Sequence, residues 1–123
     1  MAKILVVDDD DAVRVLIRDS LELDGHDIDE ASTGKGLMET FDIHNIDLIV
    51  TDLVMPDKSG IDVIMEIKKA HPDIHIVAIS GGGGITGRFD YLPIAKLIGA
   101  QFILRKPFQM KELRDIVNEQ VAA

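Results

Sequence analysis

Blocks of apolar residues alternate with amphipathic stretches along the whole chain. Short runs rich in branched residues are typical of buried strands, and each run is followed by apolar residues at helical spacing. Such runs predict strands at residues 4–7, 27–31, 48–50, 74–79 and 102–104. A strict alternation of strands and helices indicates parallel strands joined by right-handed crossovers, so helices must cover both faces of the sheet.

The helical stretches are recognised by apolar stripes and by their stop signals. Gly25 and Gly99 stand where the first and fourth stretches should end, and Pro72 disfavours a helical conformation at His71. The stripe of the second stretch is short, with Leu37, Met38 and Phe41. Together the stripes predict helices within residues 13–21, 37–41, 61–68, 92–98 and 110–121.

The second predicted strand differs from the others because acidic and apolar residues alternate along it. This alternation indicates a half-exposed strand, so we expect residues 27–31 at an edge of the sheet. The chain has 123 residues, of which 46% are hydrophobic and 28% charged, which is the balance of one globular domain. The pattern therefore predicts a single α/β domain built on a doubly wound, five-stranded parallel sheet.

Charge and cysteine content exclude several classes of function. Thirteen basic and 22 acidic residues give a net charge of −9, which disfavours binding to a phosphate backbone. Cysteine is absent, which excludes disulfides, thiolate zinc sites and thiol nucleophiles. The four histidines show no metal-ligand spacing. No signal peptide or membrane span is evident, so we expect a cytoplasmic protein without a nucleic-acid or membrane partner.

Polar residues gather where the predicted strands end, which is where open parallel sheets hold their sites. Asp8 and Asp9 follow the first strand, Asp52 the third, Ser80 the fourth and Lys106 the fifth. If the three carboxylates converge within about 4 Å, each like-charge pair costs about 4 kcal/mol at an effective dielectric near 20. Protonation or a cation relieves this repulsion, and Mg²⁺ suits carboxylates combined with a carbonyl, waters and a phosphate oxygen.

An aspartate between Mg²⁺ and Lys106 can attack a phosphoryl group, because charge on the transferred oxygens is neutralised from both sides. Ser80 can exchange a hydrogen bond with a phosphoryl oxygen. A simpler interpretation is that Asp8 to Asp11 only cap a helix, and Asp10 or Asp11 is expected to do so. One cap does not account for four acids and a matching Asp52, so the set indicates phosphoryl transfer onto a protein carboxylate.

These residues carry a resemblance that covers essentially the whole chain. In this order and at these intervals, the strings resemble the receiver domain of bacterial two-component response regulators. The strings are Ile4-Leu5-Val6-Val7-Asp8-Asp9-Asp10, Asp52-Leu53-Val54-Met55-Pro56 through Gly60, Val77-Ala78-Ile79-Ser80-Gly81, and Gly99-Ala100 through Lys106-Pro107-Phe108. The resemblance implies a flavodoxin-like (βα)₅ fold with strand order 2-1-3-4-5, like that of single-domain CheY-like receivers.

The resemblance also implies a role for each matching residue. Asp52 is expected to be the phosphoacceptor, while Lys106 pairs with the phosphoryl group and Ser80 binds it in the activated state. Asp8, Asp9, Asp52 and the backbone carbonyl of Val54 are expected to hold Mg²⁺ or Mn²⁺, with Asp8 partly acting through water. The bond between Lys106 and Pro107 is expected to be cis.

Two features depart from the family pattern. Ile103 stands where the family usually has an inward-swinging Tyr or Phe, and Phe102 is its neighbour on the opposite side of the strand. The segment from Gly81 to Asp90 is unusually long and rich in glycine, which predicts a loop that is costly to order. How switching works with Ile103, and what Gly81 to Gly84 contribute, are questions that the sequence leaves open.

Three hypotheses for function follow, in decreasing order. The first is a stand-alone receiver over residues 1–123 without an output domain. It would take a phosphoryl group from a sensor histidine kinase or histidine phosphotransfer protein and catalyse only its own phosphorylation and dephosphorylation. Its downstream protein target is expected to bind residues 90–99, Phe102 and residues 111–120. The second is a receiver-like module that binds its partner without phosphorylation.

The third hypothesis is a nucleotide-binding enzyme, because Gly82 to Gly87 formally match the dinucleotide pattern G-x-G-x-x-G. Residues 102–107, about 20 positions further on, include no acid that could bind a ribose. Arg88-Phe89 replace the Lys and Ser or Thr of a P-loop. The glycines therefore favour a loop over a nucleotide site.

Overall fold

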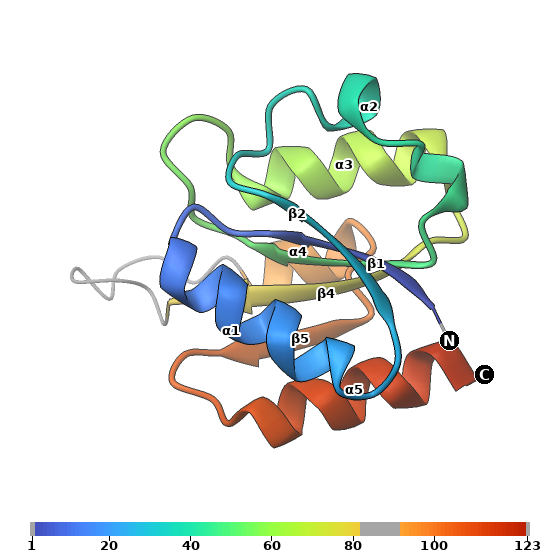
Figure 1. Ribbon diagram of the computed structural model, residues 1–123. Helices are drawn as coiled ribbons and strands as arrows, with labels where there is room; N and C mark the ends of the chain where they lie inside the picture. The colour runs from blue at the N-terminus through green and yellow to red at the C-terminus, as the bar shows by residue number, and fades with distance from the viewer. Residues whose placement is uncertain (1, 82–91, 123) are drawn as a thin grey trace.

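The chain forms a parallel five-stranded sheet with helices on both faces (Figure 1), as seen in a computed structural model that describes residues 2–81 and 92–122. The strands are β1 (Lys3–Val7), β2 (Asp27–Ala31), β3 (Leu48–Asp52), β4 (His75–Ser80) and β5 (Phe102–Arg105). The helices are α1 (Asp11–Glu22), α2 (Leu37–Thr40), the 3₁₀ helix η1 (Ile43–Asn45), α3 (Gly60–Ala70), α4 (Leu92–Leu97) and α5 (Met110–Ala122). The order β2-β1-β3-β4-β5 confirms the predicted flavodoxin-like topology.

The strand ends lie slightly further along the chain than the hydrophobic pattern predicts. β3 continues through Thr51 and Asp52 because both residues pair with β4, and β4 continues to Ser80, which pairs with β5. Backbone pairing is indifferent to side-chain polarity, whereas the prediction followed the apolar residues alone. Ile74, predicted to begin the fourth strand, instead donates its amide to His71 in the preceding turn. β2 lies at the sheet edge, as predicted.

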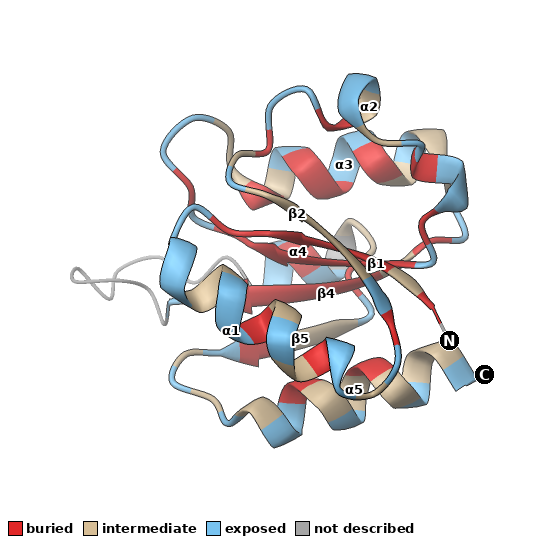
Figure 2. Ribbon diagram, viewed as in Figure 1, coloured by how far each residue is buried: buried red, intermediate tan, exposed pale blue. Residues whose placement is uncertain are grey.

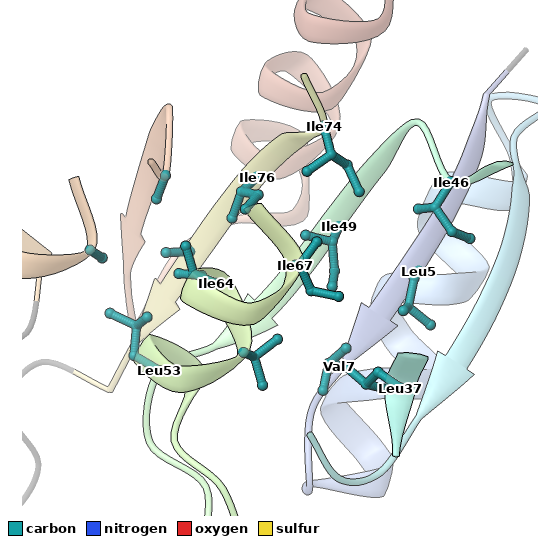
Figure 3. Packing of buried hydrophobic residues seen from close by; sticks show 14 of the residues in the cluster. Leu5, Val7, Leu37, Ile46, Ile49, Leu53, Ile64, Ile67, Ile74 and Ile76 are labelled. Atoms are coloured by element: carbon teal, nitrogen blue, oxygen red, sulfur yellow. The ribbon is translucent and has the colours of Figure 1, made fainter. Parts of the chain in front are cut away.

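The core is divided into two layers by the sheet, because successive strand residues point to opposite faces. One layer joins alternate residues of the central strands to α2, α3 and α4, and Figure 3 shows Leu5, Ile49 and Ile76 facing Ile64 and Ile67 of α3. The other layer lies between the sheet and helices α1 and α5. Its fully buried members include Ile4, Val6, Ile17, Leu21, Leu113 and Val117. Figure 2 shows the central strands buried along their length.

Local signals begin and end the helices as expected. Asp10 is the N-cap of α1 and its carboxylate accepts hydrogen bonds from the amides of Ala12 and Val13. Gly25 and Gly99 take positive φ angles of 87° and 120°, which favour glycine after a helix. No helix within residues 2–81 or 92–122 is both long and apolar enough to cross a membrane.

A polar cluster joins α5 to the start of the sheet at its amino edge. Arg114 binds the Asp24 carboxylate through two nitrogens, at 2.6 and 3.0 Å, and Asn118 donates to it at 2.9 Å. His26 is buried, in contrast to the surface position expected for it. Its Nε2 lies 2.7 Å from Asn118 Oδ1, and its Nδ1 accepts from the amide of Ala2. The hydrogen bonds from Arg114 and Asn118 hold the pKa of Asp24 well below its usual value of 3.8.

Asp24→Asn is expected to lower the free energy of unfolding by about 1 kcal/mol at neutral pH, since one partner of a partly exposed ion pair is lost. A carboxyl whose pKa is depressed by folding stabilises the protein above its unfolded pKa and loses that effect as pH falls through the folded value. The difference between wild type and variant should therefore shrink below about pH 3.8. Urea melts across pH 2–7 measure it. Asp19→Asn, which changes an exposed pair with Arg18, should show a smaller difference at every pH.

Candidate functional site

Four strands bring the predicted site residues to the carboxyl edge of the sheet. Asp8 and Asp9 follow β1, Asp52 ends β3, Ser80 ends β4 and Lys106 follows β5. Neighbouring strands are tied together there, since the amide of Lys106 donates to the carbonyl of Ser80 at 2.7 Å. The sheet thus fixes the relative positions of residues that are far apart in the sequence.

Three carboxylates converge at this edge. Asp8, Asp9 and Asp52 each offer an oxygen within 4.8 Å of the other two. Lys106 Nζ lies 3.2 Å from Asp52 Oδ2 and 3.8 Å from Asp8 Oδ2. One lysine opposes three acids, so the cluster retains an excess of negative charge that favours a cation.

Asp8 is the most buried of the three, with 1% of its surface exposed. Its Oδ1 accepts from the amide of Asp10 at 2.9 Å, whereas Oδ2 has no hydrogen-bond partner among the described residues. Burial is the main reason why the pKa of Asp8 is raised above 3.8, although the Asp10 amide and the Lys106 charge oppose this shift. A buried carboxylate oxygen without a donor, beside two further carboxylates, fits the oxygen ligands that Mg²⁺ requires.

Asp52 is oriented by two contacts. Its Oδ1 accepts from the amide of Val54 at 3.1 Å, and its Oδ2 accepts from Lys106. Burial lowers the pKa of Lys106, but the charges of Asp52 and Asp8 outweigh this effect and raise it above 10.5. Lys106 is therefore a permanent cation beside Asp52, so this carboxylate lies between an ammonium group and a candidate metal position.

The remaining predicted residues lie around this cluster. Ser80 is 1% exposed at the end of β4, and Val54 is 57% exposed two residues after Asp52. The Lys106–Pro107 bond is cis, as expected from the resemblance. The dinucleotide-like segment from Gly82 to Gly87 lies outside the described residues.

The two residues around the usual aromatic position face opposite layers, as predicted. Ile103 packs with the layer containing α3 and α4, whereas Phe102 packs with the layer containing α5. Phe102 therefore points away from the side on which Ile103 lies and cannot replace the missing aromatic.

Sequence reasoning missed two residues that shape this edge. Arg14 of α1 donates to the backbone carbonyl of Asp8 at 2.9 Å, and Glu30 of β2 holds Arg14 at 3.1 Å. The sequence offered one weak signal, an arginine one turn after the N-cap of a helix that begins with acids. Gly60 was identified only as part of a string, yet a Cβ at this position would meet the backbone of Asp52 and Leu53.

Comparisons with known proteins agree with this geometry. The sequence profile of the response regulator receiver domain matches residues 4–118. The chain is 36% identical over 125 residues to the DNA-binding transcriptional regulator NtrC of Azospirillum brasilense, covering 95% of this chain but only 24% of that protein. It is 32% identical over 124 residues to the chemotaxis protein CheY of Halobacterium salinarum, covering all of both chains.

A solved structure shows the same fold with a ligand. The response regulator TrrA of Thermotoga maritima, in complex with Mg²⁺ and BeF, superposes with a TM-score of 0.80. It is 32% identical to this chain, and the match covers 98% of this chain and 99% of TrrA.

The fold and the acidic edge define a signalling receiver, and the chain belongs to the response regulator receiver domain family. This family serves two-component systems, in which receivers interact with sensor kinases, bind Mg²⁺ at an acidic pocket and signal through phosphorylation. Receivers of this kind are not enzymes in the turnover sense.

Proposed function

We propose that this chain is a stand-alone receiver whose Asp52 accepts a phosphoryl group from the phosphohistidine of a sensor histidine kinase or histidine phosphotransfer protein. The observation that carries the proposal is the position of Asp52, with Lys106 Nζ 3.2 Å from one oxygen and the carboxylates of Asp8 and Asp9 close by. A carboxylate in this setting is a nucleophile whose phosphoryl acceptor step is supported from two sides by positive charge.

Asp8, Asp9, Asp52 and the backbone carbonyl of Val54 are the proposed ligands of Mg²⁺ or Mn²⁺. The unsatisfied Oδ2 of Asp8 and the grouping of three carboxylates support this assignment. When bound, the ion supplies charge neutralisation for the transferred phosphoryl oxygens.

In the proposed transfer, an oxygen of Asp52 forms a bond to phosphorus while the bond from phosphorus to the donor's imidazole nitrogen breaks. The imidazole recovers a proton and leaves as neutral histidine. Lys106 pairs with a phosphoryl oxygen, and the hydroxyl of Ser80 binds the phosphoryl group afterwards. Hydrolysis of the aspartyl phosphate would return Asp52 to its starting state, so the chain acts only on itself.

The stand-alone role rests on the full-length match to the Halobacterium salinarum protein. Because the chain spans about a quarter of the NtrC relative, a role as part of a longer regulator is the alternative. For the downstream protein target we propose the face formed by α4, β5 and α5, and for the compartment the cytoplasm, which is typical of the family.

The test is the intact mass of the protein after incubation with acetyl phosphate and Mg²⁺. We expect one added phosphoryl group in the wild type and none in Asp52→Ala or after addition of EDTA. Asp57→Ala is a matched control, because Asp57 is an exposed acid in the same loop and is outside the carboxylate cluster. This variant should gain the phosphoryl group as the wild type does.

An adduct that persists in Asp52→Ala would refute the assignment of the acceptor. Absence of any adduct in a wild type that binds Mg²⁺, repeated with a phosphorylated histidine donor, would favour a module that binds its partner without phosphorylation.

A further inference from the structure

The turn between β1 and α1, residues 8–10, is held by its backbone on both sides of Asp8. The amide of Asp8 donates to the carbonyl of Ala31 at the end of β2, at 3.1 Å. The carbonyl of Asp8 accepts from Arg14 Nη1 at 2.9 Å. The first contact extends the sheet, whereas the second comes from a side chain of α1.

Arg14 is fixed in its own position by two carboxylates. Its Nε donates to Glu30 Oε1 at 3.1 Å, and its Nη2 lies 2.7 Å from Asp11 Oδ1. The side chain is only 14% exposed. Because a guanidinium is planar and presents its donors in fixed directions, these two carboxylates determine where the third donor points. That donor is aimed at the carbonyl of Asp8.

The carbonyl of Asp8 and the amide of Asp9 belong to one planar peptide unit. Fixing the carbonyl therefore fixes the direction in which the chain enters Asp9. The side chain of Asp9 is exposed, and among the described residues no hydrogen bond restrains its carboxylate. Its place beside Asp8 and Asp52 therefore depends on the backbone of this turn.

We propose that Arg14, oriented by Glu30, is a positioning residue for the metal ligands. It holds the peptide between Asp8 and Asp9 so that both carboxylates face Asp52. This inference rests on the proposed Mg²⁺ site and adds to it a support from outside the carboxyl edge, running from β2 through α1 to the turn.

Electrostatics and positioning predict opposite effects of removing Arg14. Its positive charge near the cluster repels a cation, so loss of charge alone would strengthen Mg²⁺ binding. Loss of the hydrogen bond to Asp8 would instead release the turn and weaken binding. Replacement of groups that orient metal ligands typically weakens metal binding by roughly 10- to 100-fold.

Arg18 provides a matched control one turn further along α1. It also binds Glu30, with Nη1 2.7 Å from Oε2, but its remaining printed contacts go to acids of α1 and not to the turn. Arg14→Gln and Arg18→Gln therefore remove the same charge from the same helix and a contact with the same glutamate. Only the first removes the contact with Asp8.

The experiment is a titration of the full chain with MgCl₂ alone, followed by the amide shifts of residues 8–10 in two-dimensional NMR at a temperature where every variant is folded. We expect Arg14→Gln to weaken Mg²⁺ binding by about 10-fold or more. Arg18→Gln should remain within about twofold of the wild type. Arg14→Lys, which retains a donor, should recover part of the loss. Glu30→Gln provides a second variant and should give an intermediate loss.

Phosphorylation by acetyl phosphate gives an independent readout. In Arg14→Gln the Mg²⁺ concentration for half-maximal rate should rise, while the rate at saturating Mg²⁺ stays within about twofold of the wild type. Unchanged or tighter Mg²⁺ binding in Arg14→Gln, or equal weakening in Arg18→Gln, would overturn the inference and leave the proposed function standing. A wild type without Mg²⁺ binding would refute the proposed function and this inference with it.

Discussion

Asp8→Asn is expected to make the metal-free protein more stable and to abolish measurable Mg²⁺ binding. The wild-type carboxylate is buried beside Asp9 and Asp52, and its Oδ2 lacks a donor among the described residues. An unsatisfied buried polar atom costs about 2 kcal/mol, and asparagine removes the charge while keeping the acceptor for the Asp10 amide. The same change removes a proposed metal ligand.

The gain should depend on pH in a defined direction. Because folding raises the pKa of Asp8, ionisation of this carboxyl opposes folding, and the penalty is absent below its unfolded pKa of 3.8. The advantage of Asp8→Asn should therefore appear only as pH rises through the raised folded value. Thermal melts in EDTA from pH 3 to pH 8 measure it.

Asp9→Asn separates the two effects of this prediction. Asp9 is exposed, so its replacement should change the melting temperature less than Asp8→Asn, while Mg²⁺ binding should still weaken. If Asp8→Asn melts below the wild type at neutral pH without metal, the buried carboxylate is not a source of instability.

Gly60→Ala is expected to cause the largest loss of stability, about 3 kcal/mol. A Cβ on Gly60 would contact the carbonyl oxygen of Asp52 and lie 2.6 Å from the Cα of Leu53. Both neighbours are backbone atoms of the segment that carries the proposed phosphoacceptor, so neither can move away by a change of rotamer. The amide of Gly60 also donates to the carbonyl of Leu53 at 2.8 Å, which draws the start of α3 against this segment.

Gly81→Ala is the matched control, since a Cβ at Gly81 would meet no heavy atom within 4 Å. Urea unfolding should show the wild-type midpoint or a slightly higher one for this variant, because alanine restricts the unfolded chain. Similar midpoints for Gly60→Ala and Gly81→Ala would show that the close approach at α3 is not a constraint. In Gly60→Ala the yield of phosphorylated protein should also fall, because Asp52 must shift.

The strand order and the meeting of Asp8, Asp9, Asp52 and Lys106 could be predicted from sequence because they follow from periodicity and topology. Apolar runs identified the strands, and parallel strands bring their carboxyl ends to one edge whatever the side chains are. The family strings then distinguished Asp52 from the other acids. Geometry within the edge was not predictable, since the unsatisfied Oδ2 of Asp8 depends on which atoms surround it in three dimensions.

Arg14, His26 and Gly60 illustrate why the rest could not be predicted. Arg14 acts through a backbone carbonyl, and carbonyls leave no mark in the sequence. His26 is buried because Asn118, 92 residues away, accepts or donates at its Nε2. Gly60 is required by a close approach of two backbone segments and not by an unusual φ angle. Each depends on contacts between distant segments, which local patterns do not encode.

The two ends of the described chain lie together, on the side of the sheet opposite the acidic edge (Figure 1). Ala2 and the last turn of α5, with Gln120 and Val121, line the same pocket. A fluorescent label, a purification tag or another protein domain joined at either end would therefore emerge away from Asp52 and leave the approach of a phosphodonor open. This placement explains in spatial terms how one fold can match both a protein of its own length and the quarter of a much longer regulator.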